Sequence, residues 1–149
     1  SINVARWLPQ MFYYFSAYKN SKKINRPITF SVPSGNFGNL CAGLMAKKIG
    51  LPIEKFLACT NLNDSVPKYL NSGIYAPNPT IQTISNAMDV GNPSNFLRIQ
   101  KIYNNDVNKL KKDVLGFSFN DKQTRKTIKE VNEKLKYILD PHGAIGNMG

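Results

Sequence analysis

Residues 28–50, ITFSVPSGNFGNLCAGLMAKKIG, predict a strand, a glycine-rich turn and a helix in immediate succession. Residues 28–32 combine β-branched and aromatic side chains with small polar ones, as short strands do. Residues 40–49 have a helical period that stops at Gly50. A helix that starts directly after a turn presents unpaired backbone N–H groups and a partial positive charge to whatever lies before it. The stretch is therefore a candidate phosphate site.

The turn itself is made of Gly35, Asn36, Phe37, Gly38 and Asn39. Its two glycines lack a Cβ, so a ligand can approach the backbone closely. The string matches neither the dinucleotide fingerprint nor the P-loop. Two readings stay open: a phosphate cradle, or a tight connection that binds nothing and uses its asparagines only as turn residues.

A second short apolar strand follows at residues 55–60, KFLACT. Strand, helix and strand in this order predict a parallel βαβ unit whose strands are buried on both faces. We therefore expect an α/β fold. No repeat or boundary divides residues 1–149, and both ends lie inside patterned segments. The chain is expected to be one incomplete domain, cut from a longer protein.

Further helices are expected on both sides of this unit. The first covers residues 4–19, with Asn3 as its N-cap and Pro9 as a kink or local break. Its apolar positions are Val4, Trp7, Leu8, Met11, Phe12 and Phe15. Asp121 is expected to cap an amphipathic helix near the end of the chain. Its inward positions would be Ile128, Val131, Leu135 and Ile138.

Residues 61–120 form an irregular, mostly helical excursion in this prediction. Asp64 caps a short helix that ends near Gly73. Asn92 and Pro93 open another helix, as a cap followed by proline at the first helical position. Residues 110–115 extend the helical material and residues 117–119 are extended.

Composition limits the classes of function. Twenty Lys and Arg against nine Asp and Glu give a formal charge of +11, which would suit nucleic acid. The acidic residues interrupt the basic ones and the arginines form no cluster, so a solvated helical surface is favoured. No apolar run reaches the ~20 residues of a membrane span. Cys41 and Cys59 are expected as buried thiols in a reducing, cytoplasmic protein.

Four longer segments are more specific than the turn. They are SINVARWLPQMFYYF, SVPSGNFGNLCAGLMAKKIGLPIEKF, ACTNLNDSVPKYLNSGIY and ISNAMDVGNPSNFLRI, followed at the end by DPHGAIG. In order and spacing they resemble threonine synthase of the long-chain bacterial and fungal type. The resemblance implies part of the large domain of a pyridoxal-phosphate enzyme with the tryptophan-synthase-β-like fold (fold type II). That enzyme, a carbon–oxygen lyase, would convert O-phospho-L-homoserine and water to L-threonine and phosphate.

The resemblance also assigns site residues. Gly35 to Asn39 would hold the 5′-phosphate of pyridoxal phosphate through backbone N–H groups. Ser1, Asn3 and Arg6 match the family's S-x-N-x-x-R, whose Ser and Arg lie near the substrate's phosphate. A guanidinium offers a rigid fork of donors for that group. The alternative is that Ser1 and Asn3 cap the first helix and Arg6 is an exposed charge.

The family's cofactor-binding lysine lies upstream in an F-K-D context, and no such string occurs here. No catalytic residue is therefore assigned within the chain. By itself it is expected to lack synthase activity and to bind pyridoxal phosphate weakly or not at all.

Four further residues stay without a firm role: Asn61 and Asp64 after the second strand, Asp89, and His142. Ligands of open α/β sheets lie beyond the carboxyl ends of the strands, which makes a site role for Asn61, Asn63 and Asp64 conceivable. A helix cap is favoured for that trio.

Two alternative functions remain. One is another fold-type-II enzyme, a dehydratase or sulfhydrylase, against which the S-x-N-x-x-R segment and the NAMD stretch argue. The other is a basic nucleic-acid-binding module, whose binding would depend steeply on salt.

Overall fold

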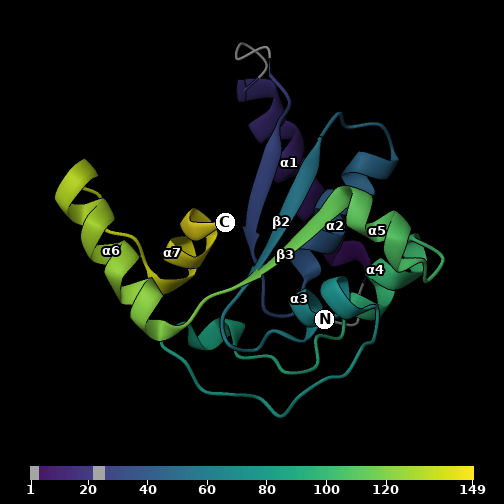
Figure 1. Ribbon diagram of the computed structural model, residues 1–149. Helices are drawn as coiled ribbons and strands as arrows, with labels where there is room; N and C mark the ends of the chain where they lie inside the picture. Colours follow the sequence, from purple (N-terminus) through teal and green to yellow (C-terminus); the bar gives the residue numbers. More distant parts are fainter. Residues whose placement is uncertain (1–3, 22–25) are drawn as a thin grey trace.

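A computed structural model describes residues 4–21 and 26–149; Ser1 and Asn3 lie outside this part. At its centre is a sheet of three strands, β1 (Thr29–Pro33), β2 (Lys55–Thr60) and β3 (Val114–Ser118), in the order β1-β2-β3 (Figure 1). Both pairings are parallel, with Thr29 opposite Lys55 and Phe56 opposite Val114. The predicted βαβ unit and the α/β class are confirmed.

Helices lie on both faces of the sheet (Figure 1). On one face, Phe56 and Ala58 of β2 share a core cluster with residues of α1 (Trp7–Ser21), α2 (Gly38–Lys48), α3 (Ser65–Ser72), α4 (Phe96–Ile102) and α5 (Val107–Asp113). On the other face, Cys59 packs with Ile145 of α7 (Pro141–Met148). Successive strand residues point to opposite faces, so β2 is covered on both sides.

The first helix starts later than predicted. Residues Val4–Arg6 form a 3₁₀ turn, η1, and α1 begins at Trp7. Pro9 falls in the first turn of α1, where backbone N–H groups have no intrahelical partner in any case, so its missing N–H removes no helical hydrogen bond.

The predicted apolar face of α1 is only partly correct. Trp7 and Met11 are buried as expected, but Tyr14 joins them instead of Leu8, Phe12 and Phe15, which are exposed. Aromatic residues occur all around this helix, so periodicity cannot select the inward side. Packing selects it: the Tyr14 ring lies edge-on to Phe56, with centroids 5.7 Å apart.

Two boundaries in the excursion are wrong. The helix expected at Asn92 and Pro93 begins at Phe96, because residues 93–96 form a turn in which the Phe96 N–H donates to the Pro93 carbonyl at 3.1 Å. Residues 110–115 are not helical throughout: α5 ends at Asp113 and β3 begins at Val114. The edge of β2 offers hydrogen-bond partners to this segment, a long-range effect that helical propensity does not include.

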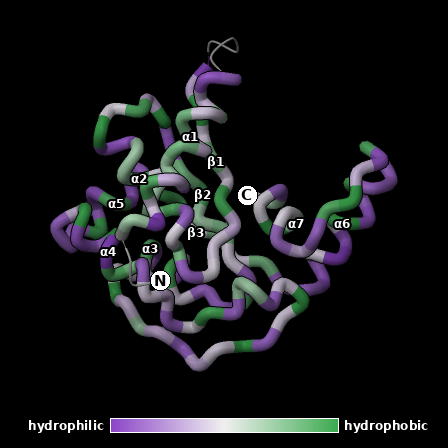
Figure 2. Tube along the Cα trace, turned by 180° about the vertical axis from the view of Figure 1, so that it is seen from behind, coloured by the Kyte–Doolittle hydropathy of each residue, from purple (hydrophilic) through white to green (hydrophobic). Residues whose placement is uncertain are grey.

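The long helix near the end, α6 (Asp121–Leu135), is capped by Asn120 and not by Asp121. Asn120 and Gln123 form a reciprocal capping box. The predicted inward face is also wrong. Thr124 is the buried residue of α6, whereas Leu135 is 71% exposed, Ile138 lies beyond the helix and is 78% exposed, and Ile128 and Val131 are half-buried. The helix extends away from the sheet alongside α7, and Figure 2 shows both hydrophobic and hydrophilic residues along it.

Cys41 and Cys59 are buried free thiols, as predicted. Burial raises the pKa of the Cys41 thiol to about 12. Within residues 4–21 and 26–149, the helices are too short or too polar to cross a membrane.

Candidate functional site

The turn between β1 and α2 takes its unusual backbone from Phe37. This residue adopts the left-handed conformation with φ 61° and ψ 15°, which is rare for a bulky side chain. Its ring is buried and lies edge-on to Phe96, with centroids 6.0 Å apart. Core packing therefore compensates a local strain of about 1–3 kcal/mol, of the kind that gathers at ligand sites.

Gly35 is required by packing. A Cβ at this position would lie 2.7 Å from Met88 Cα and 3.1 Å from the Ala87 carbonyl oxygen. Both belong to η3 (Asn86–Met88), a 3₁₀ turn of the excursion. The missing Cβ thus lets the excursion lie directly against the turn.

The two asparagine side chains of the turn bind the protein itself. Asn39 accepts from the Leu40 N–H at 2.9 Å and donates to the Pro33 carbonyl at 2.8 Å. Asn36 accepts from the Ser94 N–H at 2.6 Å and from its hydroxyl at 3.0 Å. The unusual backbone angles expected of these asparagines fall on Phe37 instead, and their side chains fasten the turn to Pro33, Leu40 and Ser94.

The backbone donors of the turn remain available. Within the described chain, the N–H groups of Gly35, Asn36, Phe37, Gly38 and Asn39 donate no hydrogen bond. The first turn of α2 carries no acidic residue, and its last turn carries Lys47 and Lys48. No side chain of the first turn therefore adds a negative charge that would repel an anion at the N-terminal end of α2.

A pocket of about 730 Å³ lies against these five residues. Its walls come from η1, α1, the end of β1, η3, Asn95 and the start of α7, and include Arg6, Trp7, Gln10 and His142. No Asp or Glu of the described residues lines it. The size is within the ~300–1,000 Å³ of ligand sites.

Three side-chain atoms of this wall are buried without a hydrogen-bond partner among the described residues: Trp7 Nε1, Gln10 Oε1 and His142 Nε2. Such atoms are uncommon, since burial without a partner costs about 1–3 kcal/mol. All three atoms are shielded from solvent by neighbouring protein atoms, so they lie behind the pocket surface and do not face its contents.

Sequence reasoning found part of this wall. Arg6 lines the pocket with an exposed side chain, and its substrate role stays a prediction. Trp7, Gln10 and Asn95 were missed. The sequence did contain one signal for Gln10: it lies four residues after Arg6, and residues four apart on a helix share a face. Asn95 is held by Arg98, whose Nη1 donates to its Oδ1 at 3.1 Å while the guanidinium lies 4.7 Å from the Trp7 ring centroid.

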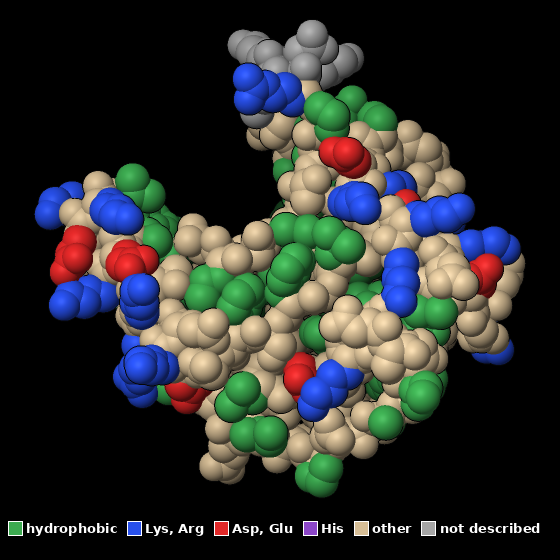
Figure 3. Space-filling view, viewed as in Figure 1, with side chains coloured by type: hydrophobic (Ala, Val, Ile, Leu, Met, Phe, Trp, Pro, Cys, Tyr) green, Lys and Arg blue, Asp and Glu red, His purple; other side chains and the backbone are tan. Residues whose placement is uncertain are grey.

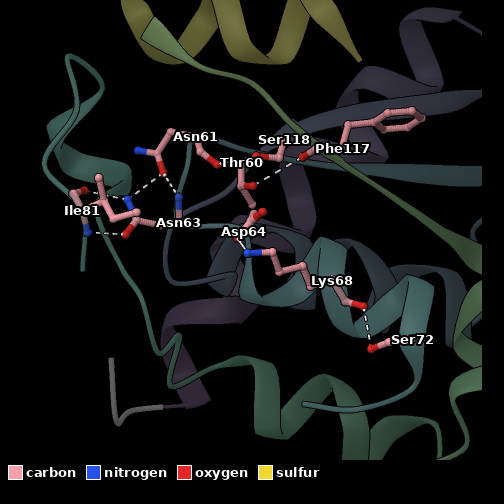
Figure 4. A network of polar contacts seen from close by, with 9 residues as sticks. All are labelled: Thr60, Asn61, Asn63, Asp64, Lys68, Ser72, Ile81, Phe117 and Ser118. Atoms are coloured by element: carbon pink, nitrogen blue, oxygen red, sulfur yellow. Dashed lines mark hydrogen bonds and ion pairs between the residues drawn. The ribbon is translucent and has the colours of Figure 1, made fainter. Parts of the chain in front are cut away.

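The polar residues after β2 do not line this pocket. Figure 4 shows Asn63 bound to Ile81 and Asn61 bound to Ser118. Asn61 Nδ2 also donates to Asp89 Oδ1 at 2.7 Å, so Asn61, Asn63 and Asp89 anchor the excursion that carries η3.

Asp64 occupies the N-cap position of α3 without a capping hydrogen bond from its side chain. It forms an ion pair with Lys68 at 2.9 Å instead (Figure 4).

The basic surface is dispersed. Figure 3 shows Lys and Arg spread over the helices, with acidic residues between them. On α6, Lys126 lies 3.6 Å from Glu130 and Lys129 lies 3.8 Å from Glu133. This pattern is that of the predicted solvated surface.

The comparisons with known proteins first define a class. A fungal L-serine ammonia-lyase from Rhizomucor miehei shares the fold, with a TM-score of 0.75 at 14% identity over 98% of this chain and 44% of that chain. A structure of PLP-bound threonine synthase from Brucella melitensis superimposes better, with a TM-score of 0.92 at 34% identity over 99% of this chain and 37% of that chain. The chain therefore has the α/β fold that this ammonia-lyase and threonine synthase share. No protein-family model matches it.

Sequence similarity identifies the family. Threonine synthase of Buchnera aphidicola subsp. Acyrthosiphon pisum is 47% identical over 146 residues, which are 97% of this chain and 34% of that protein. The chain belongs to the threonine synthase family. It spans about a third of the length of the curated relatives it matches.

Proposed function

We propose that Gly35 to Asn39 hold the 5′-phosphate of pyridoxal phosphate, and that the chain is the phosphate-binding part of a threonine synthase. The observation that carries this proposal is the set of five N–H groups, in the turn and at the start of α2, that have no partner among the described residues, against a pocket that no described Asp or Glu lines. A phosphate at a helix N-terminus accepts such N–H groups and is stabilised by the helix dipole.

The reaction proposed for the whole enzyme is the conversion of O-phospho-L-homoserine and water to L-threonine and phosphate, a carbon–oxygen lyase reaction. When bound, the cofactor supplies an electron sink for the carbon next to the substrate's amino group. Arg6, on the pocket wall, is proposed to bind the substrate's phosphate through its guanidinium. Ser1 and Asn3 are proposed partners in the same task.

The 149 residues are proposed to be inactive alone. They contain no lysine in an F-K-D context, the position that covalently holds the cofactor in this family. Without that bond, the cofactor would be held by its phosphate and by the pocket wall.

An added negative charge at the start of α2 tests the phosphate site. Gly38→Asp puts a carboxylate where the proposal puts a phosphate, and Gly38→Asn is a control of nearly equal size. Both side chains favour helix starts, so helix stability changes little. In the full reading frame containing these residues, Gly38→Asp should weaken pyridoxal-phosphate binding at least about tenfold relative to Gly38→Asn, a difference of ~1.4 kcal/mol. Equal dissociation constants, measured by cofactor fluorescence, would refute the phosphate site.

A further inference from the structure

Asn95 presents a side-chain amide to the pocket beside the start of α2. It lines the pocket, and its Nδ2 lies 3.3 Å from the point where a Cβ on Gly38 would stand. The residue is only 2% exposed. No described residue accepts a hydrogen bond from Nδ2, yet Nδ2 is not among the unpartnered atoms that the protein shields from solvent. The amide nitrogen is therefore reached from the pocket.

Arg98 decides which end of this amide faces the pocket. Its Nη1 donates to Asn95 Oδ1 at 3.1 Å, and a guanidinium has N–H donors but no acceptor. The amide oxygen must therefore face Arg98, which turns Nδ2 and its two N–H groups toward Gly38. The guanidinium in turn lies 4.7 Å from the ring centroid of Trp7, which is buried. Asn95 is thus held in one orientation.

Helix capping does not explain this side chain. Asn95 occupies the N-cap position of α4, where an asparagine oxygen ordinarily accepts a backbone N–H of the first helical turn. Here the side chain makes no such bond, because Oδ1 accepts from the Arg98 side chain. The local structure therefore leaves the amide nitrogen without a task.

The residues on both sides of Asn95 are fastened to the turn. Ser94 donates to Asn36 Oδ1 from its N–H at 2.6 Å and from its hydroxyl at 3.0 Å. Phe96 is buried edge-on to the Phe37 ring. Nδ2 is therefore fixed relative to the N–H groups of the turn, as a ligand-binding donor has to be.

We propose that Asn95 donates a hydrogen bond from Nδ2 to an oxygen of a phosphate monoester bound at the start of α2, and that Arg98 positions this donor. The inference rests on the proposed function. Cofactor and substrate both carry such a phosphate, and the place of Nδ2 beside Gly38 favours the 5′-phosphate of pyridoxal phosphate. Arg98 acts through the amide, because a cation at the amide oxygen polarises the group and strengthens its N–H donors.

Ligands with and without the phosphate test this contact. Dissociation constants of pyridoxal 5′-phosphate and of pyridoxal are measured for the full-length protein by cofactor fluorescence. Asn95→Leu should weaken pyridoxal 5′-phosphate about tenfold or more, the effect of one lost hydrogen bond to a charged group, and pyridoxal by less than about twofold. Asn95→Asp keeps an acceptor for Arg98 but replaces the donor by a carboxylate, so its loss should be larger than that of Asn95→Leu.

A double-mutant cycle tests the positioning role of Arg98. Arg98→Leu should lower the preference for pyridoxal 5′-phosphate over pyridoxal. In Asn95→Leu the same change should have little further effect, since the amide through which it acts is gone. Fully additive losses would refute the positioning role.

The outcomes separate the two phosphates. If both Asn95 variants keep the preference for pyridoxal 5′-phosphate but raise the KM of O-phospho-L-homoserine about tenfold, the contact is with the substrate's phosphate. If neither quantity changes, or if both forms of the cofactor weaken equally, the inference is overturned while the phosphate site stands. A parent protein that binds pyridoxal as tightly as pyridoxal 5′-phosphate would instead refute the proposed function.

A competing acceptor for Nδ2 is Gln10 Oε1, which would lie 3.8 Å from the same Cβ position on Gly38. If the two side chains pair with each other in solution, Asn95→Leu and Gln10→Leu should lower stability alike in urea unfolding and leave the phosphate preference unchanged. That result would also overturn the inference. If Asn95→Leu does not fold, Asn95→Asp decides by the same preference.

Discussion

The contact between Gly35 and η3 leads to a quantitative prediction for Gly35→Ala. The added Cβ would meet Met88 Cα at 2.7 Å, and the neighbours would have to move by about 0.7 Å to reach the 3.4 Å of an ordinary contact. Both nearest neighbours are backbone atoms, so no side-chain rotation relieves the overlap. Overpacking of this kind costs about 1–3 kcal/mol. Replacing a glycine that has negative φ returns roughly 0.4–1 kcal/mol through the unfolded state, so a net loss of roughly 1–2 kcal/mol is expected.

Gly38→Ala is the matched control, because its Cβ would meet side chains and no backbone, the Asn95 amide at 3.3 Å and Gln10 Oε1 at 3.8 Å. Its stability should stay within about 0.5 kcal/mol of the parent, since alanine favours the helix and the amide can move. Urea unfolding of the full-length protein measures the stabilities, and a pyridoxal-phosphate titration measures the affinities. Gly35→Ala should lose both, because the turn can relieve the overlap only by shifting. Parental stability of Gly35→Ala, or a larger loss in Gly38→Ala, would refute this account of the turn.

Three further changes test the surrounding structure. Asn61→Leu should destabilise the protein by about 1–3 kcal/mol in urea unfolding, because it removes the Asn61 hydrogen bonds to Asp89 and to the Asn63 amide from a buried polar network; a neutral result would show that the network does not anchor the excursion. Lys126→Ala should change stability by less than about 0.5 kcal/mol, because its ion pair with Glu130 at 3.6 Å is exposed. Cys41 makes stability pH-dependent: its folded pKa is raised from 9.0 to about 12, so the unfolded chain releases the thiol proton first, and stability falls as the pH rises from 9 towards 12. Cys41→Ala should flatten that decline in urea midpoints measured between pH 8 and 11, and an unchanged slope would contradict it.

The steepness of that alkaline decline is not due to Cys41 alone. Burial also raises the pKa of Tyr14 and of Tyr103 above the value of 10.0, and Tyr103 donates to Asp113 at 2.6 Å, which disfavours its ionised form further. Because the unfolded chain releases these phenol protons first, both groups also lower the stability of the protein as the pH rises, as the thiol does. Cys41→Ala should therefore reduce the slope without removing it.

Elements defined by consecutive residues could be predicted from the sequence. The strand, turn and helix of residues 28–50 and the strand at Lys55–Thr60 were located to within two residues. The later start of α4 and the earlier start of β3, of which only residues 117–119 were expected to be extended, have a different origin, because a turn at Pro93 and the edge of β2 decide them. The buried sides of α1 and α6 were also misassigned. Both helices carry more apolar residues than the core covers, and only their neighbours select the buried ones.

The sequence by itself determined the βαβ unit and the glycine-rich turn at a helix start, since these depend on local backbone preferences and on the pairing of two strands joined by a single helix. Its motifs also identified the family. The tertiary structure alone decided that Gly35 packs on η3 and that, within the described chain, Trp7, Gln10 and His142 each have a buried polar atom without a partner. Whether a polar atom is paired depends on every neighbour that surrounds it, and here those neighbours come from both ends of the chain.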